Sequence, residues 1–145
     1  MYGGAYCGIK IVRNNSFDDC IEHQRYTDYS TSEQQNFIEK NLPKLTLEQR
    51  EIYNLFSSRV SNSQTGIVFL DAPGETGKSL LINLILAHVR SQQKIAIAAA
   101  SSGITATNLN GGQTLHSTFK VPLDVHMHDM PTCAIKNCFL WQISL

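Results

Sequence analysis

The segment that follows Thr46 has the apolar periodicity of a helix that packs one face against a core. An apolar side chain recurs every three or four positions, at Ile52, Tyr53, Phe56 and Val60. Thr46 and Gln49 have the spacing of a capping box, in which each side chain bonds the backbone N–H of the other residue. The pattern predicts an amphipathic helix that starts after Thr46 and ends at about Val60.

The sequence before Thr46 divides into two parts. Residues 1 to about 30 mix Gly, Asn, Asp and scattered aromatic residues without periodicity, which is typical of an irregular arm. Ser32 and Gln35 have the spacing of another capping box, for a short helix that runs through Lys40 and ends before Pro43. We therefore predict an irregular N-terminal arm over residues 1–30, followed by a domain that begins with this helix.

Two short apolar runs flank a long apolar helix. Residues 67–70 are a continuous apolar run bounded by turn residues, as in a strand buried on both faces of a parallel sheet. Residues 80–89 are apolar almost all round at helical length, and residues 95–100 have the character of a second strand. Strand, loop, helix and strand form one right-handed crossover, the minimal unit of a doubly wound α/β nucleotide-binding fold.

The composition is that of an ordinary soluble domain, with 145 residues and 42% hydrophobic content. No basic segment followed by an apolar run opens the chain, and no stretch approaches the roughly 20 apolar residues of a membrane span, so we expect an intracellular protein without membrane contact. Lys plus Arg and Asp plus Glu number 12 each, so the net charge gives no argument about nucleic acid.

The first apolar run leads directly into a phosphate-binding motif. Residues 72–79 match the pattern G-x-x-x-x-G-K-[ST], with Ala at the first position. A loop between a strand and a helix points its backbone N–H groups into one concavity, to which the helix dipole adds positive charge. By this geometry Lys78 reaches the β and γ phosphate oxygens, Ser79 holds Mg²⁺, and Gly77 lets the backbone approach closely. The predicted ATP-binding residues of this phosphate loop are Ala72, Pro73, Gly74, Glu75, Thr76, Gly77, Lys78 and Ser79, with Lys78 and Ser79 as the predicted catalytic residues.

Glu75 is unusual in such a loop, because its carboxylate should repel a triphosphate. We therefore expect the chain to bind nucleotide more weakly than a Glu75→Gly variant.

Hydrolysis needs further groups, which the sequence after the loop does not supply. A second Mg²⁺-directing acid should follow a strand, and an arginine finger is often required. The only carboxylates after Ser79 are Asp124 and Asp129, neither of which follows a four-residue apolar strand, and the only arginine is Arg90. Residues 138–145 are apolar enough to be a further strand. We therefore expect a fragment of a larger nucleotide-binding domain.

Three stretches resemble the petite-integration-frequency (Pif) family of superfamily-one DNA helicases, in the form associated with Helitron transposons. Residues 45–53 look like the family's glutamine motif, residues 69–79 contain the phosphate loop, and residues 99–106 with 111–119 resemble a single-strand-binding segment. The last stretch is the most specific, because generic phosphate-loop proteins lack it. The resemblance implies an incomplete RecA-like P-loop NTPase domain over residues 31–145, with a parallel sheet and a helical N-terminal segment.

The resemblance gives Gln49 a second interpretation. Its carboxamide would recognise the N6 and N7 edge of adenine, so that the site prefers ATP. The capping box with Thr46 explains the same residue without a ligand. The sequence alone leaves both interpretations open.

The resemblance also implies contacts from hydroxyls and backbone amides to the sugar-phosphate backbone of single-stranded DNA. The implied DNA-binding residues are Ser101, Ser102, Gly103, Thr114, His116 and Ser117. The alternative is that Ser101–Gly103 only cap a short helix that ends at Gly111 and Gly112. The sequence departs from the family pattern at Glu75, Thr105, Asn108 and Gln113.

By resemblance, the whole protein would be an ATP-dependent DNA helicase that uses Mg²⁺ and moves 5′-to-3′ along single-stranded DNA. The family's roles are DNA repair, recombination and genome or telomere maintenance, so we expect a location in the nucleus, with the mitochondrion as the alternative. Because the second acid and the arginine finger are missing, we expect the isolated chain to bind ATP and Mg²⁺ without unwinding DNA. The alternatives are a catalytically inactive, nucleotide-binding remnant of a transposon-derived helicase and an unrelated phosphate-loop ATPase or kinase.

Overall fold

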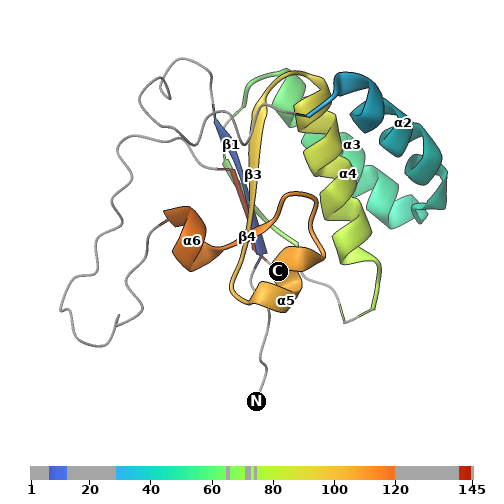
Figure 1. Ribbon diagram of the computed structural model, residues 1–145. Coiled ribbons are helices and arrows are strands. Elements are labelled where there is room, and N and C mark those ends of the chain that lie inside the picture. Colours follow the sequence, from blue (N-terminus) through green and yellow to red (C-terminus); the bar gives the residue numbers. More distant parts are fainter. Residues whose placement is uncertain are drawn as a thin grey trace, which may run out of the picture.

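The computed structural model describes residues 7–12, 29–64, 66–70, 73, 75–119 and 141–144 (Figure 1). The helices are α2 (Thr31–Asn41), the 3-10 turn η2 (Leu42–Lys44), α3 (Leu47–Ser61), α4 (Lys78–Ser91), α5 (Gly103–Thr107) and α6 (Leu115–Phe119). The strands are β1 (Cys7–Val12), β2 (Gly66–Phe69), β3 (Ile95–Ala100), β4 (Gln113–Thr114) and β5 (Trp141–Ser144). The predicted strand–loop–helix–strand unit is thus formed by β2, the phosphate loop, α4 and β3.

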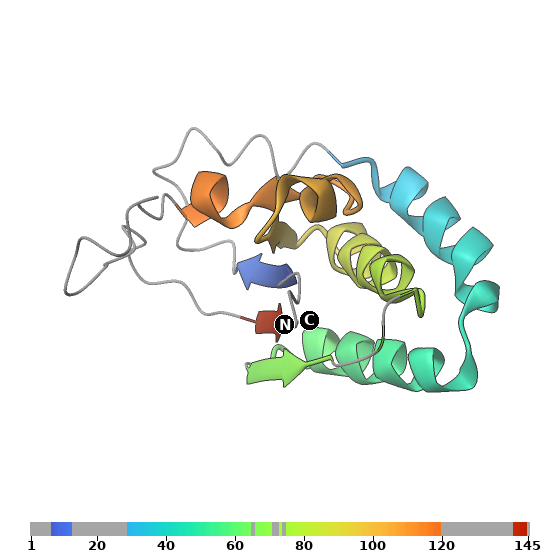
Figure 2. The same ribbon diagram turned by 90° about the horizontal axis from the view of Figure 1, so that it is seen from below.

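The strands form two ladders that lie side by side (Figure 2). β2 pairs in parallel with β5, while β3 pairs in parallel with β4 and antiparallel with β1. Because β1 also lies beside β5, the strands follow one another in the order β4, β3, β1, β5, β2. Helices α2, α3 and α4 gather on one side of these strands, which confirms the predicted fold class, an incomplete α/β RecA-like domain.

Two strands were not predicted, β1 and the two-residue β4. Cys7–Val12 form β1, which pairs with β3 along its whole length, from Cys7 opposite Ala100 to Val12 opposite Ile95. The prediction of an irregular arm over residues 1–30 was wrong for this segment, and residues 1–6 and 13–28 lie outside the described residues. The reason is physical: six residues have no strand signature strong enough to stand alone, and this strand takes its hydrogen bonds from a partner far away in the sequence.

The two helices before the phosphate loop begin differently. In α3 the predicted capping box is present: the N–H of Gln49 donates to Thr46 Oγ1 at 3.3 Å, and the N–H of Thr46 donates to Gln49 Oε1 at 3.0 Å. α2 spans the predicted residues, but its N-cap is Ser30, without a side-chain capping bond. The predicted capping box of Ser32 and Gln35 was wrong, because Ser32 lies inside the helix and its Oγ is paired with Ser30 Oγ at 2.8 Å.

Helix α4 forms the centre of the core. It packs against α2, α3 and β3, and its Leu84 and Leu86 are both 0% exposed. Each fully buried Leu or Ile contributes roughly 1.5–3 kcal/mol relative to an exposed one, so this packing fixes the direction of α4 and with it the loop at its N-terminus. Although α4 is apolar almost all round, none of the described helices has both the length and the apolar character needed to cross a membrane.

The stability of this core is expected to decrease as the pH falls below the ordinary histidine value of 6.5. Burial, together with the nearby positive charge of Lys94, lowers the pKa of His88, which lies between Tyr53 on α3 and Gln92, the C-cap residue of its own helix. The unfolded chain then binds the proton more readily than the folded chain, so the stabilisation is present above pH 6.5 and is lost on acidification. Urea unfolding between pH 7.5 and 5.5 measures this loss, which should be smaller in His88→Gln. Equal pH dependence in both proteins would contradict the prediction.

Candidate nucleotide-binding site

The described part of the phosphate loop ends in a left-handed turn at Gly77, which starts α4. Gly77 is the N-cap of the helix, with φ at 77° and ψ at 16°, and glycine adopts this conformation without steric cost. Its carbonyl accepts the N–H groups of Leu80 at 3.0 Å and Leu81 at 3.2 Å. A Cβ at this position would lie only 3.2 Å from Gln49 Nε2, so both the turn and the close contact with α3 favour glycine. Ala72 and Gly74 of the predicted site lie outside the described residues.

Two side chains of the loop meet at one backbone oxygen. Lys78 Nζ donates to the carbonyl of Pro73 at 2.9 Å, and Thr76 Oγ1 donates to the same carbonyl at 2.9 Å. A phosphate oxygen carries more negative charge than a carbonyl and is a stronger acceptor for an ammonium group. The Lys78 ammonium therefore already lies against the loop, from which a phosphate group could draw it.

Gln49 connects α3 to the phosphate loop. Its Nε2 donates to the carbonyl of Thr76 at 2.7 Å, while its Oε1 accepts the N–H of Thr46 in the capping box. The capping interpretation of Gln49 is thereby confirmed. Recognition of adenine stays a prediction, and it would require the carboxamide to exchange at least one of these bonds for the base.

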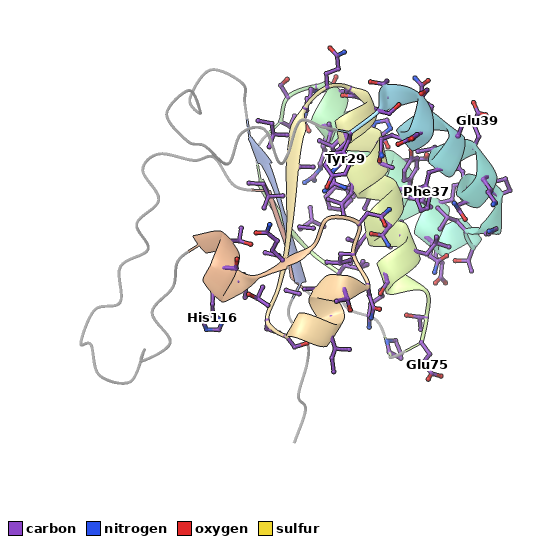
Figure 3. The ribbon with its side chains drawn as sticks, viewed as in Figure 1. Tyr29, Phe37, Glu39, Glu75 and His116 are labelled. Atoms are coloured by element: carbon purple, nitrogen blue, oxygen red, sulfur yellow. The ribbon has the colours of Figure 1, made fainter. Side chains whose placement is uncertain are left out.

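Glu75 has a left-handed backbone although it is not glycine. Its φ is 61°, and its exposed side chain extends away from the body of the protein (Figure 3). This conformation costs a non-glycine residue roughly 1–2 kcal/mol. Glutamate thus occupies a position whose backbone conformation suits glycine.

We expect Glu75→Gly to bind Mg-ATP about threefold or more tightly than the wild type, because it removes both a negative charge and backbone strain near the phosphates. Glu75→Gln separates these effects, since it removes the charge and keeps the strained backbone. Titration with a fluorescent ATP analogue at low and high salt measures both variants, and the gain from Glu75→Gln should shrink as salt screens the charge. The same affinity in all three proteins would show that Glu75 does not affect nucleotide binding.

Ser79 lies in the first turn of α4, next to Lys78, and is exposed. Across the part of the chain that the structure describes, no group of three or more His, Cys, Asp or Glu side chains could hold a metal ion by itself. Mg²⁺ usually keeps several water ligands and is bound through one or two protein groups together with phosphate oxygens. The Ser79 hydroxyl therefore fits this ion only in combination with a bound nucleotide.

The residues predicted to bind DNA lie at the carboxyl ends of two neighbouring parallel strands. Ser101 directly follows β3, and Thr114 ends β4, opposite Ala100. Figure 3 shows His116 of α6 and Glu75 of the phosphate loop on the same lower side of the molecule. The structure thus brings the whole predicted set to the edge where the phosphate loop lies: Ser101, Ser102, Gly103, Thr114, His116 and Ser117.

The hydroxyl groups of Ser102 and Thr114 have hydrogen-bond partners within the protein. Ser102 Oγ is the N-cap of α5: it accepts the N–H of Thr105 at 3.2 Å and pairs with Thr105 Oγ1 at 2.8 Å. Thr114 Oγ1 accepts the N–H of Ser117 at 3.3 Å. The capping alternative is confirmed for Ser102, although α5 ends at Thr107, before the predicted stop at the glycine pair. DNA binding by these residues stays a prediction.

Two residues of α4 that the sequence analysis did not assign to the site hold the loop between α5 and β4. Asn83 Nδ2 donates to the carbonyl of Asn108 at 3.0 Å, and Asn83 Oδ1 accepts the N–H of Asn110 at 2.8 Å. Arg90 Nη1 donates to the carbonyl of Asn110 at 2.8 Å. Asn83 is the one polar residue in the apolar run 80–87, and a lone polar residue on a buried helix is a signal for a satisfied hydrogen bond.

Comparison with known proteins assigns these features to a family. The sequence model described as "PIF1-like helicase" matches residues 44–140, a range that contains α3, the phosphate loop and the segment predicted to bind DNA. Over 52 residues the chain is 48% identical to the "ATP-dependent DNA helicase Pif1" of Campylobacter jejuni. This stretch is 36% of the chain and 11% of that protein, so the chain spans about a tenth of the length of the relative that it matches. No solved structure gives a significant match.

Proposed function

Because the chain belongs to the PIF1-like helicase family, we propose that it is part of an ATP-dependent DNA helicase and that its phosphate loop binds ATP with Mg²⁺. The observation that carries this proposal is the junction of the loop with α4, where Lys78 Nζ lies against the carbonyl of Pro73 beside the left-handed turn at Gly77. The first turn of a helix leaves N–H groups without intrahelical partners, and the helix dipole makes this end partly positive. Such an end binds phosphate.

In the proposed site, three groups act on the triphosphate. Lys78 exchanges the Pro73 carbonyl for the β and γ phosphate oxygens, while the N–H groups at the start of α4 bind the same phosphates. The Ser79 hydroxyl would hold Mg²⁺, and the ion would neutralise part of the phosphate charge. The packing of the buried α4 directs these groups toward the phosphate loop.

Single-stranded DNA is the proposed second ligand, at the carboxyl ends of β3 and β4. Residues 95–119 contain no Lys, Arg, Asp or Glu, so contacts from this segment would come from hydroxyls and backbone amides. Such contacts release few counterions, and their dependence on salt is correspondingly small. Movement in the 5′-to-3′ direction, the roles in DNA repair, recombination and telomere maintenance, and a nuclear or mitochondrial location belong to the same proposal and are supported by the family resemblance.

Gln49→Ala is expected to abolish a preference for ATP over GTP and to lower the free energy of unfolding by about 1 kcal/mol, because it removes the reciprocal capping bond. Parallel titrations with fluorescent ATP and GTP analogues and urea unfolding measure the two effects. Thr46→Ala is the matched control: it removes the N-cap hydroxyl and keeps the carboxamide, so it should lower stability and leave the preference intact. Loss of the preference in both variants would assign it to the helix and refute adenine recognition by Gln49.

Binding of both ligands by the purified chain tests the proposal as a whole. The chain is titrated with a fluorescent ATP analogue in Mg²⁺ and with a labelled single-stranded oligonucleotide, and it is then assayed for unwinding of a duplex with a 5′ single-stranded tail. We expect saturable binding of nucleotide and weak binding of DNA, without unwinding. No nucleotide binding by a chain with the expected circular dichroism would refute the phosphate-loop assignment. Nucleotide binding without DNA binding would favour a catalytically inactive remnant or an unrelated phosphate-loop protein, and measurable unwinding would refute the expectation that the isolated chain is incomplete.

A further inference from the structure

Asn83 joins the helix that starts at the phosphate loop to the loop that precedes β4. It lies in the second turn of α4 and is half-buried. Its Nδ2 donates to the carbonyl of Asn108 at 3.0 Å, and its Oδ1 accepts the N–H of Asn110 at 2.8 Å. Both partners are backbone groups, and the two bonds use a donor and an acceptor at once. A carboxamide carries its donor and its acceptor on two separate atoms, so it can bond both backbone groups at once.

The loop that Asn83 holds is closely connected to α5. Leu109 is 5% exposed in the core, and the N–H of Gly112 donates to the carbonyl of Leu109 at 2.9 Å. A Cβ at Gly112 would meet the carbonyl of Ala106 in α5, so the backbone is tightly packed here. α5 and the loop therefore form a compact unit, which we call the β3–β4 connection (residues 101–112).

The predicted DNA contacts lie at the two ends of this connection. Ser101–Gly103 stand at its start, after β3, and Thr114 and the first turn of α6 follow its end. Arg90 also bonds the connection, but from the last turn of α4, at the far end of the helix from the phosphate loop. Asn83, by contrast, bonds the connection from the N-terminal half of α4, which begins at the phosphate loop where a nucleotide would bind.

We propose that Asn83 is a positioning residue that couples nucleotide at the phosphate loop to single-stranded DNA at the ends of β3 and β4; this inference rests on the proposed function. A bound triphosphate draws Lys78 away from Pro73 and shifts the first turns of α4. The two bonds of Asn83 transmit this shift to the backbone of residues 108–110. Because the coupling of two binding equilibria is reciprocal, DNA then changes the affinity for nucleotide by the same factor.

The test compares the wild type with Asn83→Leu, which removes both bonds at similar side-chain volume. Asn83→Asp is the graded variant, because it keeps the acceptor for Asn110 and places an oxygen against the carbonyl of Asn108. Asn54→Leu, at an exposed position of α3, is the matched control. Each protein is titrated with labelled single-stranded DNA, with and without a non-hydrolysable ATP analogue and Mg²⁺. Hydrogen exchange of residues 101–119 is measured in the absence of DNA, once with nucleotide and once without it.

In the wild type and in Asn54→Leu, nucleotide is expected to change the DNA affinity about fivefold or more and to alter hydrogen exchange in residues 101–119. In Asn83→Leu the factor should fall below about twofold and the exchange response should disappear, while nucleotide affinity changes by less than about threefold. Asn83→Asp should give an intermediate factor. A residue that only supports the fold would weaken DNA binding equally with and without nucleotide, and this outcome would overturn the inference.

Other outcomes separate this inference from the function on which it rests. A wild type that binds nucleotide without any change in exchange at residues 101–119 would overturn the coupling and leave the nucleotide site standing. Coupling in Asn83→Leu as strong as in the wild type would also overturn the inference about Asn83 and leave the nucleotide site standing. A folded wild type that binds no nucleotide would refute the proposed function, and the coupling with it.

Discussion

Replacing Lys78 with alanine is expected to weaken the binding of Mg-ATP by roughly 100-fold, because charge-assisted bonds to phosphate are lost and each contributes about 1.5–3 kcal/mol. The substitution should not destabilise the fold. Lys78 is the first residue of α4, where a positive charge opposes the helix dipole and alanine has a high helix propensity. Titration with a fluorescent ATP analogue in Mg²⁺, with far-ultraviolet circular dichroism on the same samples, separates lost binding from lost structure.

Two further variants show whether position or charge alone matters. Lys40→Ala removes the same charge from an exposed site in the last turn of α2 and should leave nucleotide affinity within about twofold of the wild type. Lys78→Arg keeps the charge but presents a broader planar group, and it should recover only part of the affinity. Equal nucleotide binding by the wild type and Lys78→Ala would show that the loop does not bind phosphate in the predicted way.

Replacing Arg90 with methionine is expected to lower the free energy of unfolding by about 2–4 kcal/mol. Arg90 is only 3% exposed and donates to two carbonyls, that of Asn110 at 2.8 Å and that of Ala96 at 3.1 Å. Its guanidinium carbon also lies 3.9 Å from the centre of the Tyr29 ring, a favourable cation–π contact. Burial lowers the pKa of Arg90, as expected for a cation removed from water. Methionine fills most of the space but leaves the two carbonyls without this donor.

Urea unfolding of three variants tests the role of Arg90. Arg90→Lys keeps a charge but cannot donate in a fork to two carbonyls, so it should be destabilised nearly as much as Arg90→Met. Arg50→Met is the control, since Arg50 is exposed and donates to the carbonyl of Leu42 at 3.1 Å; its effect should stay below about 1 kcal/mol. A stability of Arg90→Met equal to that of the wild type would show that burial of the guanidinium costs as much as its bonds contribute.

Local features of this protein could be predicted because neighbouring residues produce them. The capping box of α3 involves residues only three apart, and the amphipathic pattern after it depends on one helical period. The phosphate-loop motif likewise consists of eight consecutive residues, 72–79. For the same reason, the helix after the loop and the strand at residues 95–100 were correctly predicted.

Contacts between distant residues could not be predicted in this way. The second bond of Gln49, to the carbonyl of Thr76, joins residues 27 apart, and the antiparallel pairing of β1 with β3 joins the chain near its start to its middle. The bonds of Asn83 depend on how α4 packs beside the β3–β4 connection. None of these contacts leaves a periodic pattern in the sequence, because the two residues of each contact lie far apart in the chain. Each of these residues also has a common local role, such as capping a helix, that explains it without a distant partner.

The sequence by itself therefore determined helices α2, α3 and α4, strands β2 and β3, and the position of the phosphate-loop motif, because backbone geometry and apolar periodicity act over a few residues. Tertiary structure alone decided that Gln49 is bonded to the loop and that Asn83 connects the loop's helix to the segment predicted to bind DNA. These features depend on packing around α4, which brings residues into contact only once the core has formed.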